Sequence, residues 1–231
     1  MIQAKNLHFK YEDILILEDI NLEIKECSFT AIIGANGSGK TTLAKHFNGL
    51  LIPSNGTVFV DGLDTKKHSE EARRKVGFVF QNFEDQLIHS VVEEDIAFGL
   101  ENLGLKSAEI DKTVKYTLNK LKIGYIRRMN VNTLSSGQKQ LVALAGILAM
   151  KPKYIVFDEP TTMLDSANKK NIMSIIRELN KNEMTIILVT NVLDDLKYTD
   201  KIIVLKQGKV IFNDAKSKLN KTILKRASLY A

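Results

Sequence analysis

The octapeptide GANGSGKT, Gly34 to Thr41, limits the folds open to this 231-residue chain more than any other feature. It satisfies the phosphate-loop pattern G-x-x-x-x-G-K-[ST], follows the strand-like segment FTAII and opens the helical segment TTLAKHFNGL. In that context the glycines let backbone N–H groups turn towards a phosphate, and the helix N-terminus adds partial positive charge. A glycine-rich turn with a surface lysine is the alternative, and the flanking strand and helix disfavour it. We therefore expect a nucleotide-binding loop.

Residues of this loop have separate expected roles. Lys40 would reach the β- and γ-phosphates, and the Thr41 hydroxyl would ligate Mg²⁺. The residues of this segment expected to contact nucleotide are Gly34, Ala35, Asn36, Gly37, Ser38, Gly39, Lys40, Thr41 and Thr42.

Two adjacent carboxylates end a second apolar segment, YIVFDE. Asp158 suits the coordination of the magnesium ion, and Glu159 is placed to orient or deprotonate the water that attacks the γ-phosphate. Two adjacent acids could instead cap the next helix, but their place at the end of a buried strand favours the catalytic interpretation. Together the two motifs predict hydrolysis of ATP or GTP.

Hydrophobic periodicity divides the chain into three regions. Short apolar runs over residues 1 to about 33 predict strands, and residues 84–150 have a helical pattern. Strands return with YIVFD, TIILVT and KIIVLK, and KQGKVIF predicts a hairpin with Gly208 in its turn. We expect one α/β domain over 1–231, with a mainly parallel P-loop NTPase core, an N-terminal antiparallel β subdomain and an inserted α-helical subdomain.

Composition narrows the possible functions only slightly. A hydrophobic content of 44% and the single cysteine, Cys27, are typical of a globular protein from a reducing compartment. The sequence predicts neither a signal peptide nor a spanning segment of roughly 18 apolar residues. The net charge of +6 comes from scattered lysines that often neighbour acids, so it favours a solvated surface over a nucleic-acid or membrane patch.

A third motif, LSSGQKQ from Leu134 to Gln140, begins a helix and resembles the signature sequence of ABC-type ATPases, usually LSGGQ. Other elements of that family follow in the right order. Gln81 in GFVFQN matches the glutamine loop, Asp165 ends the TTMLD loop after the catalytic acid, and Tyr11 matches the aromatic residue that stacks on adenine. The resemblance covers essentially the whole chain.

This resemblance implies a site shared between two subunits, with the P-loop of one and the signature helix of the other enclosing each ATP. It implies catalytic roles for Lys40, Gln81 and Glu159, and Mg²⁺ contacts from Thr41, Gln81 and Asp158. A monomer should then bind ATP but hydrolyse it poorly. Further nucleotide contacts are implied for Tyr11, Ser135, Ser136, Gly137, Gln138 and Asp165.

The segment VGFVFQNFEDQLIHSVVEEDIAFGLENLGL, residues 76–105, is similar to ATPase subunits of energy-coupling factor transporters, which import vitamins and cobalt or nickel ions. Phe83 replaces the proline of their FQNPDDQ form, while Gln86 and VEEDIAFG are retained. The alternative is that VEEDIAFG arose by sequence drift in the helical subdomain of some other ABC ATPase. The resemblance implies ATP and Mg²⁺ as cofactors and a peripheral place on the cytoplasmic face of the membrane. It also implies two kinds of partner, a second ATPase subunit and integral membrane subunits. A nucleic-acid partner is not expected.

Asn191 departs from the family pattern, because it stands in VTNVLD where ABC ATPases usually have the switch histidine. Asn after a strand is also a common helix N-cap. It keeps hydrogen-bonding capacity but cannot carry a proton's charge, and losing such a transition-state contact typically costs about 2.7–4 kcal/mol. We therefore expect weakened hydrolysis and favour a heterodimer whose partner carries histidine; a homodimer with low turnover stays open. Ser136 and Leu141 replace the usual Gly and Arg.

Two other function classes remain. A soluble ABC ATPase acting on nucleic acid or ribosomes would usually fuse two ATPase domains or insert a coiled coil, and this sequence has neither. A regulatory module that binds ATP with little turnover is supported by Asn191 and opposed by the retained Glu159.

Overall fold

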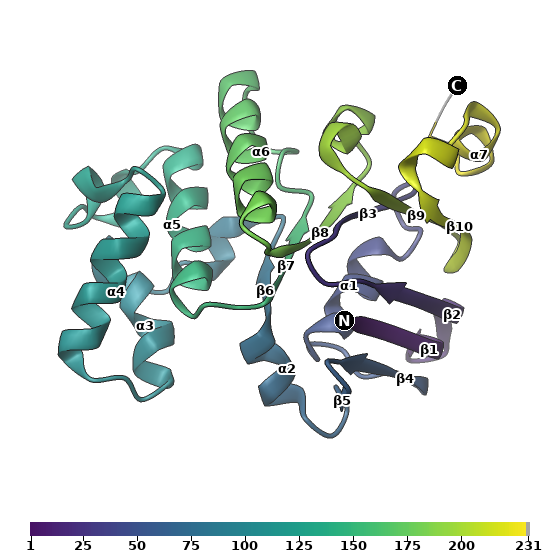
Figure 1. Ribbon diagram of the computed structural model, residues 1–231, viewed down its shortest axis with the longest axis horizontal. Helices are drawn as coiled ribbons and strands as arrows, with labels where there is room; N and C mark the ends of the chain where they lie inside the picture. Colours follow the sequence, from purple (N-terminus) through teal and green to yellow (C-terminus); the bar gives the residue numbers. More distant parts are fainter. Residues whose placement is uncertain (230–231) are drawn as a thin grey trace.

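The centre of the molecule is a six-stranded sheet in the order β10-β9-β3-β8-β7-β6, seen in a computed structural model that describes residues 1–229 (Figure 1). Neighbouring strands are parallel except β10, which runs antiparallel to β9. β3, β6, β7 and β8 are buried at every residue, as expected where both faces of a parallel sheet are covered. The strands are β3 (Phe29–Ile33), β6 (Val76–Val79), β7 (Tyr154–Asp158), β8 (Thr185–Thr190), β9 (Lys201–Lys206) and β10 (Lys209–Ala215).

A second, antiparallel sheet has the order β2-β1-β4-β5 and lies beside the first in Figure 1. Its strands are β1 (Ile2–Tyr11), β2 (Ile14–Ile24), β4 (Asn55–Val60) and β5 (Leu63–Asp64). Helix α1 (Lys40–Phe47) shares one apolar core with both sheets, through Leu43, Ala44 and Phe47. The phosphate loop that precedes α1 therefore has fixed structure on both sides.

Three helices between β6 and β7 form the helical subdomain, coloured teal in Figure 1: α3 (Val92–Asn102), α4 (Ser107–Lys120) and α5 (Ser136–Ala149). Their apolar faces join the core on the other side of the parallel sheet, which also receives α6 (Ser166–Lys181). Short helices α2 (Ser69–Lys75) and α7 (Lys221–Arg226) complete the fold, together with 3₁₀ turns that include Phe83–Gln86 and Leu193–Tyr198. The predicted fold class is confirmed. Within residues 1–229, none of the helices has both the length and the apolar character needed to cross a bilayer.

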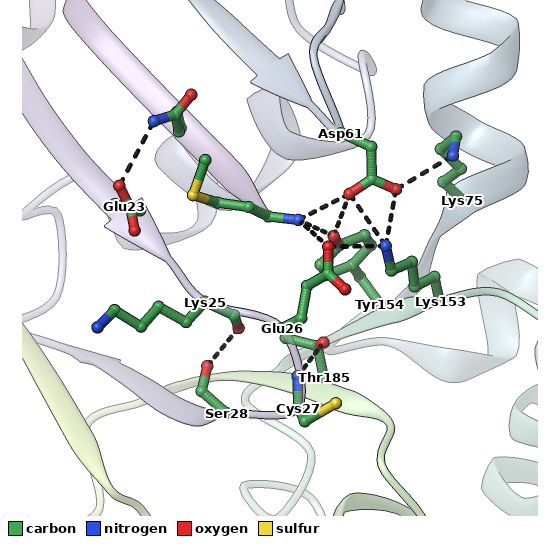
Figure 2. A network of polar contacts seen from close by, with 12 residues as sticks. Glu23, Lys25, Glu26, Cys27, Ser28, Asp61, Lys75, Lys153, Tyr154 and Thr185 are labelled. Atoms are coloured by element: carbon green, nitrogen blue, oxygen red, sulfur yellow. Dashed lines mark hydrogen bonds and ion pairs between the residues drawn. The ribbon is translucent and has the colours of Figure 1, made fainter.

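A polar network joins the two sheets at the end opposite the carboxyl ends of the parallel strands (Figure 2). Asp61, in the turn between β4 and β5, accepts hydrogen bonds from Lys75 Nζ at 3.1 Å and Lys153 Nζ at 3.2 Å, and also from the Tyr154 hydroxyl and the Met1 amino group. Burial alone would raise the pKa of the Asp61 carboxyl, but these donors together hold it well below its usual range. The network thus links β1, β7 and α2 at one point.

The hairpin between β9 and β10 turns at Gln207 and Gly208, as predicted, with φ angles of 47° and 75°. Gly208 N donates to Ser38 O at 3.1 Å, and Gly208 O accepts from Glu18 N at 2.9 Å. A Cβ atom at residue 208 would lie 2.2 Å from Ile16 O, so only glycine fits. This turn therefore joins the β1–β2 hairpin to the phosphate loop.

Candidate active site

The phosphate loop leaves the carboxyl end of β3 and enters α1 through a backbone that requires glycine. A Cβ atom on Gly34 would lie 2.3 Å from Leu205 O. Gly39, the N-cap of α1, has a φ of 98° and provides no side-chain cap. The first turn of α1 therefore keeps its N–H groups free of a capping side chain, which suits an anionic ligand.

Lys40 is 5% exposed, yet its ammonium group has no carboxylate within ion-pair distance among residues 1–229. Nζ donates instead to Gly34 O at 3.0 Å and Ala35 O at 3.1 Å. Burial lowers the pKa of Lys40, while the nearby acids Glu159 and Asp158 oppose that shift. In the described part of the chain, Ser38 Oγ beside it is also buried without a hydrogen-bond partner. A cation and an unsatisfied hydroxyl inside a glycine loop fit a bound phosphate.

Asp158 ends β7 and is 2% exposed. Its Oδ1 accepts a hydrogen bond from Thr41 Oγ1 at 2.9 Å. Burial raises the pKa of Asp158, which the Thr41 hydroxyl partly offsets. One carboxylate and one hydroxyl are hard oxygen donors, and Mg²⁺ commonly uses few protein ligands and keeps waters and phosphate oxygens for the rest. The pair therefore fits a nucleotide-bound Mg²⁺.

Glu159 follows with a left-handed backbone, φ 47°, and its N–H donates to Val189 O at 2.8 Å. Its Oε2 accepts from Gln81 Nε2 at 3.1 Å and from Thr162 Oγ1 at 3.2 Å. The glutamine after β6 and the glutamate after β7 thus meet, and their catalytic roles stay predictions. Thr162 was missed; its place three residues after Glu159 in TTMLD was the available signal.

A cleft of about 390 Å³ opens in front of these groups. Its lining residues are Tyr11, Ile16, Asn36, Gly37, Gly39, Lys40, Thr41, Thr42, Gln81 and Glu159. Tyr11 ends β1 with 46% of its surface exposed, and its ring meets that of Phe9 edge-on, with centroids 4.8 Å apart. The Tyr11 ring is therefore supported by Phe9 and still exposed enough to stack on a base. Ile16 was not predicted from the sequence.

Asn191 follows β8, and its Nδ2 donates to Asn36 Oδ1 in the phosphate loop at 3.0 Å. The N-cap of the next 3₁₀ helix is Val192, whose N–H is bound by Thr190 Oγ1 at 3.0 Å. The N-cap interpretation of Asn191 is therefore wrong. Because β8 neighbours β3, its end lies beside the loop that follows β3. A contact of Asn191 with the γ-phosphate stays a prediction.

The signature segment lies at the start of α5 and lines no part of this cleft. Ser135 is the N-cap of α5: its Oγ accepts from Gln138 N at 3.3 Å, and Gln138 Oε1 accepts from Ser135 N at 2.9 Å. Ser136 is exposed. The described chain therefore separates this segment from its own phosphate loop.

Gly137 lies against Asn168 in the first turn of α6, the helix that Asp165 caps. A Cβ atom at residue 137 would lie 2.6 Å from Asn168 Oδ1. Asp165 is the N-cap of α6 and accepts from Ala167 N and Asn168 N, both at 2.9 Å. In this chain Asp165 has a helix-capping role, and its contact with nucleotide stays a prediction. Leu141, one turn into α5, is buried in the apolar core, where an apolar side chain suits the site better than the family's usual Arg.

Two buried polar side chains near Glu159 were not predicted. Gln140, on α5 and 2% exposed, donates from Nε2 to Pro160 O at 2.8 Å. Asp195, on the 3₁₀ helix after β8 and 8% exposed, accepts from Thr161 Oγ1 at 2.6 Å and Thr190 Oγ1 at 3.1 Å. Their burial depends on contacts between distant segments, so the sequence gives no direct signal.

Comparison with known proteins agrees with this geometry. The ABC transporter family profile matches residues 17–162. The energy-coupling factor transporter ATP-binding protein EcfA1 of Clostridium novyi is 45% identical over 91% of this chain and 78% of its own length. The cobalt import ATP-binding protein CbiO of Syntrophus aciditrophicus is 44% identical over 93% of this chain and 78% of its own length.

Among solved structures, CbiO1 from Clostridium perfringens, part of the ABC transporter complex CbiONQ, superposes with a TM-score of 0.86 and 35% identity. That match covers 99% of this chain and 94% of the other. The dimeric bacterial ABC transporter cassette MJ0796 matches with a TM-score of 0.83 and 33% identity over 93% of this chain and 98% of its own.

The chain belongs to the ABC transporter family. It is an ATP hydrolase of the transporter-cassette type, and its similarity to EcfA1 and CbiO agrees with the resemblance found in residues 76–105.

Proposed function

We propose that the chain is the ATPase subunit of an importer that carries a micronutrient, a vitamin or a transition-metal ion, and that it acts at the cytoplasmic face of the membrane. The observation that carries this proposal is the cleft in which Lys40, Thr41, Gln81 and Glu159 converge, in a chain similar to cobalt and energy-coupling factor ATPases. No residue of this cleft is assigned to the cargo, which would be bound by a membrane partner.

ATP is the substrate of the cleft. Lys40 and the glycine-loop N–H groups would bind its phosphates, while Thr41 and Asp158 would hold Mg²⁺, which neutralises phosphate charge when bound. Glu159 would accept a proton from the attacking water, and Gln81 would orient that water through its 3.1 Å contact with Glu159. Asn191 supplies hydrogen bonds to this region but no proton.

A second ATPase subunit would complete the site. The signature segment, with exposed Ser136 at the N-terminus of α5, does not line its own cleft and would be accessible to the γ-phosphate of ATP bound by a partner. The similar cassette MJ0796 is dimeric. We favour a heterodimer, because a partner with histidine at the position of Asn191 would provide one fast site.

The surface around residues 84–90 would receive the membrane subunit. Ile88 is 64% exposed there. Gln86 links this surface to β6, since its Nε2 donates to Phe78 O and its Oε1 accepts from Phe80 N, both at 2.9 Å. Gln81 is the next residue after Phe80, so a shift of this surface would move a group that contacts Glu159.

The Asn191→His variant tests the catalytic part of this proposal. Restoring a charged contact should raise steady-state ATP hydrolysis by about 10²-fold, the lower end of what one such group contributes. Phosphate release from the assembled ATPase dimer measures it, since a monomer is expected to hydrolyse ATP poorly. Adding Glu159→Gln to Asn191→His should remove the gain, which assigns it to this chain's own site. A wild type within twofold of Asn191→His would contradict weakened hydrolysis.

Isolation of the chain from native membranes tests the transport part. We expect a second ATPase and integral membrane subunits to accompany it. Recovery of nucleic acid or ribosomes in their place would contradict the importer function.

A further inference from the structure

We propose that Asp195 is a positioning residue that fixes Glu159 and Asn191 relative to each other. The inference rests on the proposed function in taking these two side chains to act at the γ-phosphate. Asp195 touches neither of them; it would act through the two segments that carry them.

The contacts of Asp195 place it between those segments. Its Oδ2 accepts from Thr161 Oγ1 at 2.6 Å, two residues after Glu159, and from Thr190 Oγ1 at 3.1 Å, one residue before Asn191. Asp195 itself lies four residues after Asn191, on the 3₁₀ helix Leu193–Tyr198. One carboxylate oxygen therefore joins the loop after β7 to both sides of the turn after β8.

Burial makes these hydrogen bonds restrictive. Thr161 is 0% exposed, Thr190 is 1% exposed and Asp195 is 8% exposed. A carboxylate that loses its donors in such a place stays unsolvated, because water has little access. The two loops are therefore expected to shift together.

The segment after Glu159 is also held by a second element. Gln140 Nε2 donates to Pro160 O at 2.8 Å, and Gln140 lies on α5, the helix that begins with the signature segment. Asp195 and Gln140 thus fix the segment that sets the direction of Glu159, whose own backbone is left-handed at φ 47°. Small displacements of a catalytic group can reduce turnover by about 10²-fold.

The test compares isosteric Thr→Val changes at two buried threonines. Thr161→Val removes one donor to Asp195. Thr185→Val is the matched control: Thr185 is 1% exposed, its Oγ1 accepts from Cys27 N at 2.9 Å, and it lies at the opposite end of β8. We expect Thr161→Val to lower kcat per folded molecule about 10- to 100-fold with the Kd for ATP unchanged within twofold. Thr185→Val should change neither value by more than twofold.

Asp195→Asn and Asp195→Leu distinguish hydrogen bonding from charge and packing. Asn retains an oxygen that can accept from both threonines, so kcat should stay within about threefold of wild type, whereas Leu should behave like Thr161→Val. Equal kcat values for Thr161→Val and Thr185→Val would overturn the proposal.

Hydrogen–deuterium exchange in the presence of ATP gives a readout that needs no turnover. Thr161→Val should speed exchange of the amides over residues 190–195, although these lie about thirty residues from the change. Unchanged exchange there would overturn the positioning role, even if kcat fell. If Glu159→Gln leaves hydrolysis unchanged, the proposed function fails separately, and the exchange comparison still decides the role of Asp195.

Discussion

The phosphate-loop cleft and the signature segment differ in how the chain holds them. Lys40 and Asp158 in the first region are almost fully buried. Lys40 is bonded to the carbonyls of its own phosphate loop, and Asp158 is bonded to Thr41 on another element. Ser135 and Ser136 in the second are exposed, and the Ser135 cap is made within four consecutive residues. One chain therefore carries one organised half of a site and one outward-facing half, which is what a site shared between two subunits requires.

The physical origin of the difference is position in the fold. The cleft forms where parallel strands end side by side, so groups far apart in sequence are brought together by the sheet. The signature segment is the start of a helix in an inserted subdomain, and its local capping box gives it a defined shape without long-range contacts. Both regions have a defined shape, but within residues 1–229 it is the first that brings together the groups to which we assign catalysis.

Glu159→Gln should have the largest effect, and it acts on the organised half alone. Removing a general base typically reduces turnover by about 10²–10⁴-fold. Gln keeps an oxygen that can accept from Gln81 and Thr162, so ATP affinity should be preserved. Phosphate release and an ATP titration measure the two quantities, with Glu178→Gln on the exposed side of α6 as the control. In dimers formed from this chain alone, where no faster partner site contributes, a drop of less than tenfold would mean that Glu159 is not the base.

Ser136→Glu tests the outward-facing half, with an intermediate effect. A carboxylate there would repel a partner's γ-phosphate, so hydrolysis should fall by at least about tenfold while ATP binding to the isolated chain stays unchanged. Ser107→Glu is a matched control, because Ser107 is also exposed and is likewise the first residue of its helix, α4. If Ser136→Glu weakens ATP binding by the isolated chain, the two halves are not separate.

Asp158→Asn should give the smallest of the three measured changes, a slight increase in the stability of the nucleotide-free chain. The buried carboxylate is disfavoured without a cation, so Asn should stabilise the nucleotide-free chain by about 1 kcal/mol, or roughly 2–4 °C in Tm, and weaken Mg²⁺-dependent ATP binding. Burial raises the pKa of Asp158, so the folded state takes up a proton more readily than the unfolded state. The penalty is therefore present at neutral pH and disappears as the pH falls through the raised pKa.

Thermal unfolding without nucleotide, at neutral and at acidic pH, measures this effect. The Tm difference between Asp158→Asn and wild type should shrink on acidification. A lower Tm for Asp158→Asn at neutral pH would show that the carboxylate stabilises the empty site.

The sequence predicted the parts of the site whose signals are local. Gly34–Thr41, Asp158 with Glu159, and Leu134–Gln140 are short motifs that each lie at the end of an element with a clear periodicity. Strand β6 and helix α2 were not assigned, because runs of four and seven residues are too short for a periodic pattern. Thr162 lies three residues from its partner Glu159, so its role had a local signal that was missed. The role of Asp195 could not be predicted, since its contact with Thr161 forms only when the fold brings the two loops close.

Asn191 is a residue that the sequence identified but whose role it left open. Its sequence context allowed a helix cap or a ligand contact, and the choice depended on which loop lay opposite. The pairing of β8 with β3 places Asn36 there, and Val192 takes the cap position, so the cap is excluded while the ligand contact stays a prediction.

The glycine at the β9–β10 turn has a consequence for the evolution of nucleotide affinity. Gly208 touches the hairpin that carries Ile16 and the loop that carries Ser38, although it belongs to none of the nucleotide-binding motifs. A methyl group there would collide with the backbone of Ile16 and Leu17, and the turn that would have to move also donates to Ser38 O in the phosphate loop. Selection on ATP binding therefore reaches a position that lies outside every catalytic signature in the chain.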